Sequence, residues 1–237
     1  MSRSMRVEIW SDVVCPWCYV GKRNFEAALS RFEHRDDVEV IWRAFELDPS
    51  APAEREGDYA VHLARKYGMS VDQAGKMIQT MTTTGAKAGV TLDFGRARPG
   101  NTFDAHRLIH LAGERGVQDA VKERFFRAAF TDGDPIGDRG VLVRLAVEAG
   151  LPEDEAASVL ESGIYAAEVR AEESLALELG ISAVPFFVID RTFGVPGAQP
   201  PDVILKALER AWEKTAHLLG PDDASAAPGC EGNACAV

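Results

Sequence analysis

Four cysteines stand in two close pairs, Cys15 with Cys18 and Cys230 with Cys235. The first pair belongs to a Cys-Pro-Trp-Cys segment, and one helical turn would bring its two side chains close enough to form a disulfide. A thiolate attacks a disulfide, and a second thiol nearby can then resolve the mixed disulfide. The first pair therefore indicates reversible redox chemistry.

The two thiols of this segment have different expected roles. A strand-like stretch precedes them, so we expect Cys15 at the N-cap of a helix and Pro16 at its first position. The free N–H groups and the positive end of the helix dipole then stabilise the Cys15 thiolate. We predict that Cys15 is the nucleophile and that Cys18, one turn further in, is the resolving thiol. Trp17 is the aromatic residue expected to lie exposed beside them.

The second pair lies in a C-terminal stretch rich in Pro, Asp, Ala and Gly. We expect this stretch, residues 220–237, to be mobile. Cys230 and Cys235 can form a small-loop disulfide that exchanges electrons with the first pair, or bind metal together with it. Solvent-exposed reduced thiols are the simpler alternative, and the residues leave this choice open.

Strand and helix patterns surround the first pair. Residues 6–10 alternate as a strand does, residues 19 to about 35 keep apolar residues at helical spacing, and residues 38–45 are rich in β-branched and aromatic residues. Strand character returns at residues 184–190 and 192–195, ahead of a closing helix. Between about residues 55 and 179 the patterns indicate only helices, separated by Gly or Pro.

These patterns predict an α/β protein, with a thioredoxin fold interrupted by a large all-helical insertion domain. The expected units are a discontinuous thioredoxin-like domain at residues 1–50 and 180–219, a helical insertion domain at 51–179, and a flexible cysteine-containing tail at 220–237.

A proline stands at the start of the third expected strand, where it costs a hydrogen bond of the sheet. A cis peptide between Val184 and Pro185 would place the Val184 backbone beside the thiols as an edge for an extended substrate. An ordinary trans proline at the first residue of a strand is the alternative.

Composition excludes several classes of function. The chain has 237 residues, 46% of them hydrophobic, and a formal net charge of −11, so its field repels nucleic acid and anionic membranes. We expect neither as a partner. The segment from Met1 to Arg6 contains no apolar stretch long enough for a signal peptide or a membrane span, and we expect a cytoplasmic protein.

Three segments together resemble the FrnE-like branch of the DsbA family. They are residues 11–22 around the Cys-Pro-Trp-Cys motif, residues 101–108 (Asn-Thr-Phe-Asp-Ala-His-Arg-Leu), and residues 180–187 (Gly-Ile-Ser-Ala-Val-Pro-Phe-Phe). The resemblance covers about residues 6–218. It implies a thioredoxin fold with an inserted helical domain, thiol-disulfide oxidoreductase activity through the two motif cysteines, and a cis peptide at Pro185.

The resemblance also implies that the helix bearing His106 faces the motif. A histidine there can shuttle protons or stabilise a thiolate, and we place His106 with Pro16, Trp17, Val184 and Pro185 among the expected substrate-binding residues. A structural histidine in the seam between domains is the alternative. Asp12, three residues before Cys15, is expected to brace the loop through backbone N–H groups, with assistance to proton transfer from Cys18 as the alternative.

The expected function is therefore a cytoplasmic thiol-disulfide oxidoreductase that acts on protein or small-molecule disulfides and requires no dissociable cofactor. Glutathione can serve as a co-substrate. One alternative on the same scaffold is a glutathione-dependent isomerase or transferase, resembling 2-hydroxychromene-2-carboxylate isomerase or the kappa-class transferases. A second alternative is an interaction module held together by zinc at the four cysteines. The sequence does not specify the oligomeric state.

Overall fold

The computed structural model describes residues 4–55 and 57–218, and all structural statements concern these residues. The elements in chain order are β1 Met5–Ser11, α1 Pro16–Leu29, β2 Val38–Ala44, α2 Tyr59–Tyr67, α3 Val71–Lys87, α4 Phe103–Glu114, α5 Gln118–Arg127, α6 Arg139–Glu148, α7 Glu153–Glu161, α8 Ala166–Glu178, β3 Phe186–Ile189, β4 Phe193–Pro196 and α9 Pro201–Leu218. Short helical turns at Arg35–Asp37 and Ala128–Asp132 complete them.

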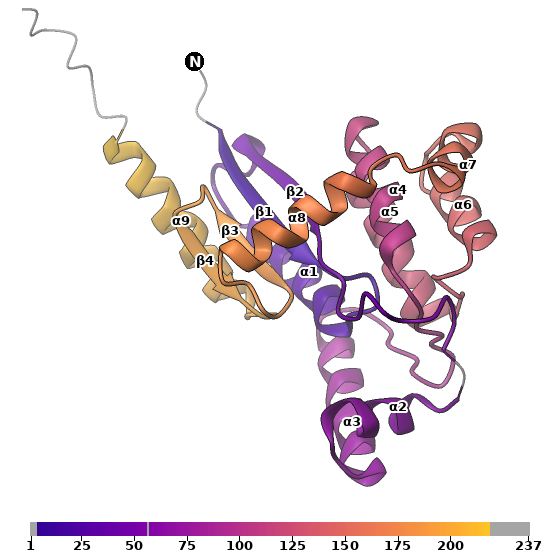
Figure 1. The fold of residues 1–237 in the computed structure, drawn as a ribbon. Helices are drawn as coiled ribbons and strands as arrows, with labels where there is room; N and C mark the ends of the chain where they lie inside the picture. Colours follow the sequence, from indigo (N-terminus) through magenta and orange to yellow (C-terminus); the bar gives the residue numbers. More distant parts are fainter. Residues whose placement is uncertain (1–3, 56, 219–237) are drawn as a thin grey trace, which may run out of the picture.

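The four strands form one sheet in the order β2-β1-β3-β4 (Figure 1). β1 is parallel to β2 and antiparallel to β3, so Ile9 lies opposite Trp42 on one side and Phe187 on the other. β4 pairs antiparallel with β3 across a turn at Asp190 and Arg191, both with positive φ. The apolar residues of β1 are buried because strands and helices cover it on every side.

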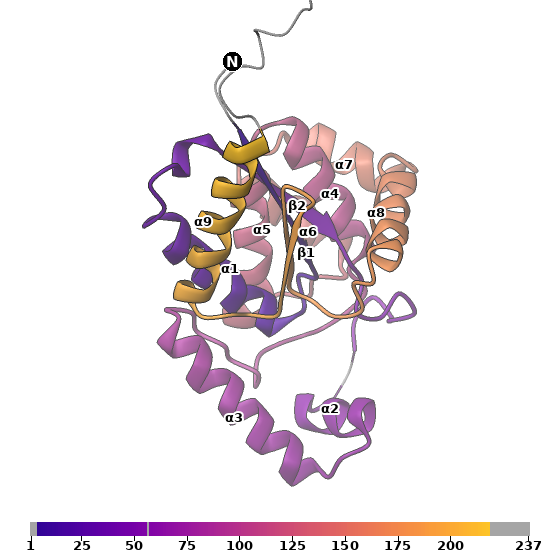
Figure 2. The ribbon, with the colours of Figure 1, turned by 90° about the vertical axis from the view of Figure 1, so that its left-hand side faces the viewer.

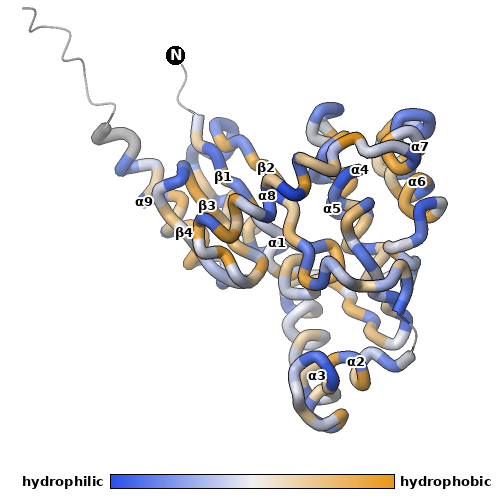
Figure 3. Tube along the Cα trace, viewed as in Figure 1, coloured by the Kyte–Doolittle hydropathy of each residue, from blue (hydrophilic) through white to orange (hydrophobic). Residues whose placement is uncertain are grey.

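Helices cover both faces of this sheet. Figure 2 shows the strands between α1 and α9 on one side and α8 on the other, with the remaining body helices behind. Hydrophilic and hydrophobic residues alternate along the helices, as amphipathic helices packed on a core require (Figure 3). The α/β thioredoxin-like fold expected from the sequence is confirmed.

The chain between β2 and β3 is helical, as expected. α2 and α3 form a hairpin that projects below the rest of the molecule (Figure 1), whereas α4 to α7 pack together beside the sheet. Local signals fix several helix starts: Ser70 and Gln73 form a capping box at α3, and the Asp138 carboxylate accepts a hydrogen bond from the Val141 N–H at α6.

The first helix starts where expected but ends earlier than the apolar spacing up to about residue 35 predicted. It begins at Pro16 and ends at Leu29, where Ser30 bonds back to carbonyls of the last turn. A turn then returns Phe32 to the core, where its ring meets Trp212 edge-on. Phe32 is buried although it lies beyond the end of the helix. The spacing of apolar residues therefore overestimates the length of the helix.

Candidate functional site

Cys15 lies where β1 gives way to α1. Its backbone is extended (φ −99°, ψ 111°), it occupies the N-cap, and Pro16 is the first helical residue, as predicted. The Cys15 N–H donates to the Asp12 carbonyl at 3.1 Å, which fixes the loop, and the Cys18 N–H donates to the Cys15 carbonyl at 3.0 Å. The thiol of Cys15 thus stands at the helix N-terminus, beside N–H groups that have no partner in the helix.

The two thiols differ in their surroundings. Both cysteines are reduced, Cys15 is 4% exposed, and Cys18 is 0% exposed. Burial raises the pKa of Cys18, and its hydrogen bond to Cys15 and the charge of Cys15 raise it further. The positive charge of Lys122 acts in the opposite direction. Cys15 is therefore placed to attack a substrate, and the more deeply buried Cys18 is placed to attack Cys15 afterwards.

The segment before β3 closes one side of the thiol pair. The Val184–Pro185 peptide bond is cis, which confirms that prediction. The Val184 carbonyl oxygen lies 3.6 Å from Cys15 Sγ and accepts a hydrogen bond from it. Pro185 packs behind this contact against α1, where a Cβ on Gly21 would stand only 2.8 Å from Pro185 Cγ.

A cleft with a volume of about 390 Å³ opens in front of Cys15. One wall contains Pro16, Trp17 and Val184, and Trp17 is 36% exposed. The opposite wall comes from the α2–α3 hairpin and the chain that leads to it. It presents apolar and cationic side chains together: Arg55, Tyr59, His62, Leu63, Lys66, Tyr67, Met77 and Met81.

Asp12 lies on the inner side of the motif. Its carboxylate accepts hydrogen bonds from the Leu47 N–H at 2.7 Å and the Val14 N–H at 3.5 Å, which is the bracing role expected for it. Burial by itself raises the pKa of Asp12. The interactions with His106, Leu47 and Lys122 outweigh burial and hold this pKa below its usual value.

His106 is not among the residues that line the cleft, and its expected role in substrate binding stays a prediction. Its Nε2 lies 3.6 Å from Asp12 Oδ1, and its side chain is 1% exposed. Neither ring nitrogen has a hydrogen-bond partner among the described residues. α4 directs His106 inward onto Asp12, whereas Cys15 lines the cleft. Pro185 is likewise buried behind Val184 and does not line the cleft.

Sequence reasoning missed Lys122 on α5. It is 0% exposed, and its Nζ donates to the Ser11 carbonyl at 3.1 Å. Burial lowers the pKa of Lys122 to about 8, against the effect of negative charge at Cys18, Asp12 and Cys15. A signal was present in the sequence, because Lys122 shares the buried stripe of α5 with Phe125 and Phe126, three and four residues further on.

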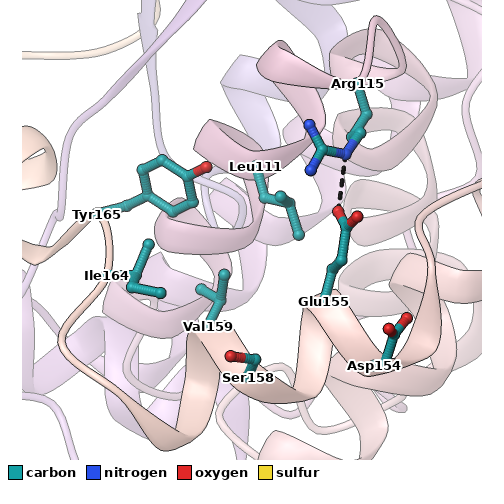
Figure 4. A pocket seen from close by; sticks show the side chains of 8 residues that line it. All are labelled: Leu111, Arg115, Asp154, Glu155, Ser158, Val159, Ile164 and Tyr165. Carbon is teal, nitrogen blue, oxygen red and sulfur yellow. Dashed lines mark hydrogen bonds and ion pairs between the residues drawn. The ribbon is translucent and has the colours of Figure 1, made fainter.

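Other concave sites lie away from the thiols. A pocket of about 340 Å³ lies between α4 and α7, where Arg115 donates to Glu155 at 2.7 Å on one side and Tyr165 lies on the other (Figure 4). Within residues 4–55 and 57–218, no group of three or more His, Cys, Asp or Glu side chains is arranged to hold a metal ion. Cys230 and Cys235 lie outside the described residues.

Comparison with known proteins agrees with this fold. A DSBA-like thioredoxin domain matches residues 6–209. The uncharacterized protein YwbO of Bacillus subtilis is 33% identical over 213 residues, which cover 89% of this chain and 99% of YwbO. The crystal structure of a probable DsbA oxidoreductase from Streptomyces coelicolor is 46% identical, with a TM-score of 0.86, and the match covers 98% of this chain and 99% of that one.

A more distant structure is the cytosolic disulfide reductase DsbM of Pseudomonas aeruginosa, solved with GSH. It is 19% identical with a TM-score of 0.61, and the match covers 88% of this chain and 99% of DsbM, which shows a shared fold. The chain described here belongs to the family of DSBA-like thioredoxin domains. Among its described helices, none combines the length and the apolar character needed to cross a bilayer.

Proposed function

We propose that this protein is a thiol-disulfide oxidoreductase that works through Cys15 and Cys18. The observation that carries the proposal is the asymmetric placement of the two thiols: Cys15 at a helix N-terminus facing the cleft, and Cys18 buried one turn behind it. Membership in a family of DsbA-like oxidoreductases supports the same activity.

The reaction takes two exchange steps. The Cys15 thiolate attacks one sulfur of a substrate disulfide, a bond forms between Cys15 and that sulfur, and the other substrate sulfur leaves with the electron pair. Cys18 then attacks Cys15, the mixed disulfide breaks, and the departing substrate sulfur takes the electron pair and the Cys18 proton. The substrate is reduced and the pair becomes a disulfide. The reverse sequence oxidises a substrate dithiol.

The cleft supplies the expected contacts with the substrate. An extended chain that passes Cys15 meets the Val184 backbone on one side and the apolar residues of the α2–α3 hairpin on the other. Arg55 in the cleft is paired with Asp48, which also lines it, so Lys66 is the basic side chain that favours a small anionic thiol and supports glutathione as a co-substrate. DsbM, which shares the fold, was solved with GSH. No dissociable cofactor takes part in this chemistry.

We assign further properties as part of this proposal. The protein acts in the cytoplasm and belongs to the FrnE-like branch. Residues 1–50 with 180–219 form the thioredoxin-like domain, and residues 51–179 form the insertion. Cys230 and Cys235 are a second pair that relays electrons to the first. Replacing both by Ser is then expected to slow turnover with protein substrates.

The test is equilibration of the full chain across a series of glutathione redox buffers, followed by alkylation and mass mapping of all four cysteines. We expect a reversible two-electron transition at Cys15 and Cys18, and its midpoint fixes the direction of electron flow relative to the cell. Thiols that never pair would overturn the proposal. A glutathione-dependent isomerase would instead keep its activity in the Cys18→Ser variant and lose it when glutathione is left out.

A further inference from the structure

Lys122 is a buried cation without a carboxylate of its own. Within the described part of the chain, no Asp or Glu oxygen lies within 4 Å of its Nζ, and the Ser11 carbonyl is the one protein acceptor that its ammonium contacts. The rings of Trp42 and Phe126 flank it, with Nζ 5.5 Å and 5.3 Å from their centroids. A fully buried ammonium is costly unless negative charge compensates it.

The nearest carboxylates are engaged elsewhere. Asp12 accepts hydrogen bonds from the Leu47 and Val14 N–H groups. Glu172 on α8 accepts from Arg43 at 2.6 Å and from the Ala44 N–H at 2.7 Å. The other lysine buried to this degree, Lys22, contrasts with Lys122, because Asp119 and Glu123 lie 3.1 Å and 3.2 Å from its Nζ.

Asp12 and Glu172 act on Lys122 only from beyond 4 Å, and the other ionisable groups of the described chain that interact with it are the two thiols. Cys18 interacts with it most strongly, ahead of Asp12, Cys15 and Glu172. The titratable groups that face this buried region come from every element packed around it: Asp12 after β1, Cys15 and Cys18 on α1, Glu46 after β2, His106 on α4 and Glu172 on α8.

We propose that Lys122 is a positioning residue for the resolving step, in which its ammonium stabilises the thiolate that forms at Cys18. This inference rests on the proposed function. It assigns a role in that function to α5, which belongs to the helical part of the chain between β2 and β3. In the step concerned, the Cys18–Cys15 bond forms, the bond from Cys15 to the substrate sulfur breaks, and the substrate sulfur leaves with the electron pair and the Cys18 proton.

A chromogenic aryl disulfide, dithiobis(nitrobenzoate), separates the two steps. Attack by Cys15 releases one aryl thiolate at a rate proportional to reagent concentration, and resolution by Cys18 releases the second at a rate independent of it. The full chain carrying Cys230→Ser and Cys235→Ser serves as reference, so that only the Cys15 and Cys18 pair reacts. Stopped-flow absorbance across a pH series records both phases.

In Lys122→Met we expect the second phase to slow at least about threefold and its pH profile to move to higher pH. Each unit added to the pKa of a thiol lowers its thiolate fraction about tenfold but raises the nucleophilicity of the thiolate about threefold, so the net rate falls about threefold. Lys122→Arg keeps the charge and restores the profile. Lys22→Met removes an equally buried lysine that faces carboxylates, and we expect its second phase to match the reference.

A superimposable second phase in folded Lys122→Met and in the reference would overturn the inference about Lys122 alone. A reference protein that shows no second phase would instead overturn the proposed function. Nitrogen-detected NMR of the unsubstituted lysine provides a test that needs no variant. Because coupling between two sites is reciprocal, ionisation of Cys18 is expected to raise the pKa of Lys122, so the titration midpoint of Lys122 is expected to be higher in the dithiol form, where Cys18 can ionise, than in the disulfide form. Equal values in the two forms contradict the proposal.

Discussion

The chemistry of the thiol pair depends on a small set of buried polar residues. Cys15 faces a cleft and Cys18 does not, so one thiol meets substrate and the other meets Cys15. Asp12 fixes the loop before the pair by accepting the Leu47 N–H. Lys122 adds a positive charge on the buried side of the thiol pair. Removing its ammonium from water lowers the stability of the fold. The residue that favours the reaction is thus expected to weaken the fold.

Replacing Lys122 by Met should stabilise the disulfide form of the protein. The pKa of Lys122 is about 8 in the folded dithiol protein and 10.5 unfolded, so folding costs about 3 kcal/mol when the lysine is charged in both states, and the disulfide form lacks the thiol charges that reduce this cost. That cost is full below pH 8 and disappears as pH rises toward 10.5, where both states are neutral. Urea unfolding at pH 7 is expected to show Lys122→Met more stable by about 1–3 kcal/mol, with the difference shrinking above pH 8. A Met variant of equal or lower stability at both pH values would contradict this account.

At the scale of elements, α1 and the segment before β3 must approach closely. Gly21 makes this possible, because α1 presents no Cβ to Pro185, which carries the Val184 carbonyl toward Cys15. The distance between the Cys15 thiol and the Val184 backbone therefore depends on the contact between Gly21 of α1 and Pro185.

We expect Gly21→Ala to disturb this contact. The added Cβ would stand 2.8 Å from Pro185 Cγ, so α1 and the Val184 segment must move apart. Overpacking of this kind costs about 1–3 kcal/mol, and the first phase of the aryl disulfide reaction should slow. Gly75→Ala on α3 is the matched control, since a Cβ there meets nothing within 4 Å. The control is expected to gain roughly 0.5–1 kcal/mol from helix propensity. Equal effects of the two variants would refute the contact argument.

What the sequence predicts at this scale depends on how local the signal is. The N-cap at Cys15 appears as expected, and the capping box at Ser70 and the cap at Asp138 likewise involve neighbours within three residues. His106 contacts Asp12, and Lys122 contacts Ser11, although about a hundred residues of chain separate the two members of each pair. A local sequence pattern therefore does not predict the direction of either side chain. Lys122 was consequently missed, and the substrate-binding role expected for His106 stays a prediction.

At the scale of the whole molecule, the cleft joins two distant parts of the chain. Cys15, Trp17 and Val184 form the wall near the sheet, and the projecting α2–α3 hairpin forms the other. The protein as a whole carries a net charge of −11, which repels anionic disulfides. Lys66 on the hairpin places positive charge at the cleft itself, so local and overall electrostatics oppose each other.

This opposition can be measured by changing charge at two places on the hairpin. Lys66→Glu and Lys76→Glu alter the net charge equally, but Lys66 lines the cleft whereas Lys76 does not and pairs with Asp72 on the exposed surface of α3. With glutathione disulfide as the anionic substrate, attack by Cys15 is expected to slow about two- to fivefold in Lys66→Glu, as fits exposed charges worth less than about 1 kcal/mol. With neutral dithiodipyridine both variants should react at the parental rate, because no charge on the substrate responds to the change. The slowing should fade at high salt as screening shortens the reach of Lys66. If both variants slow equally with glutathione disulfide, net charge governs the encounter and the hairpin does not steer the substrate.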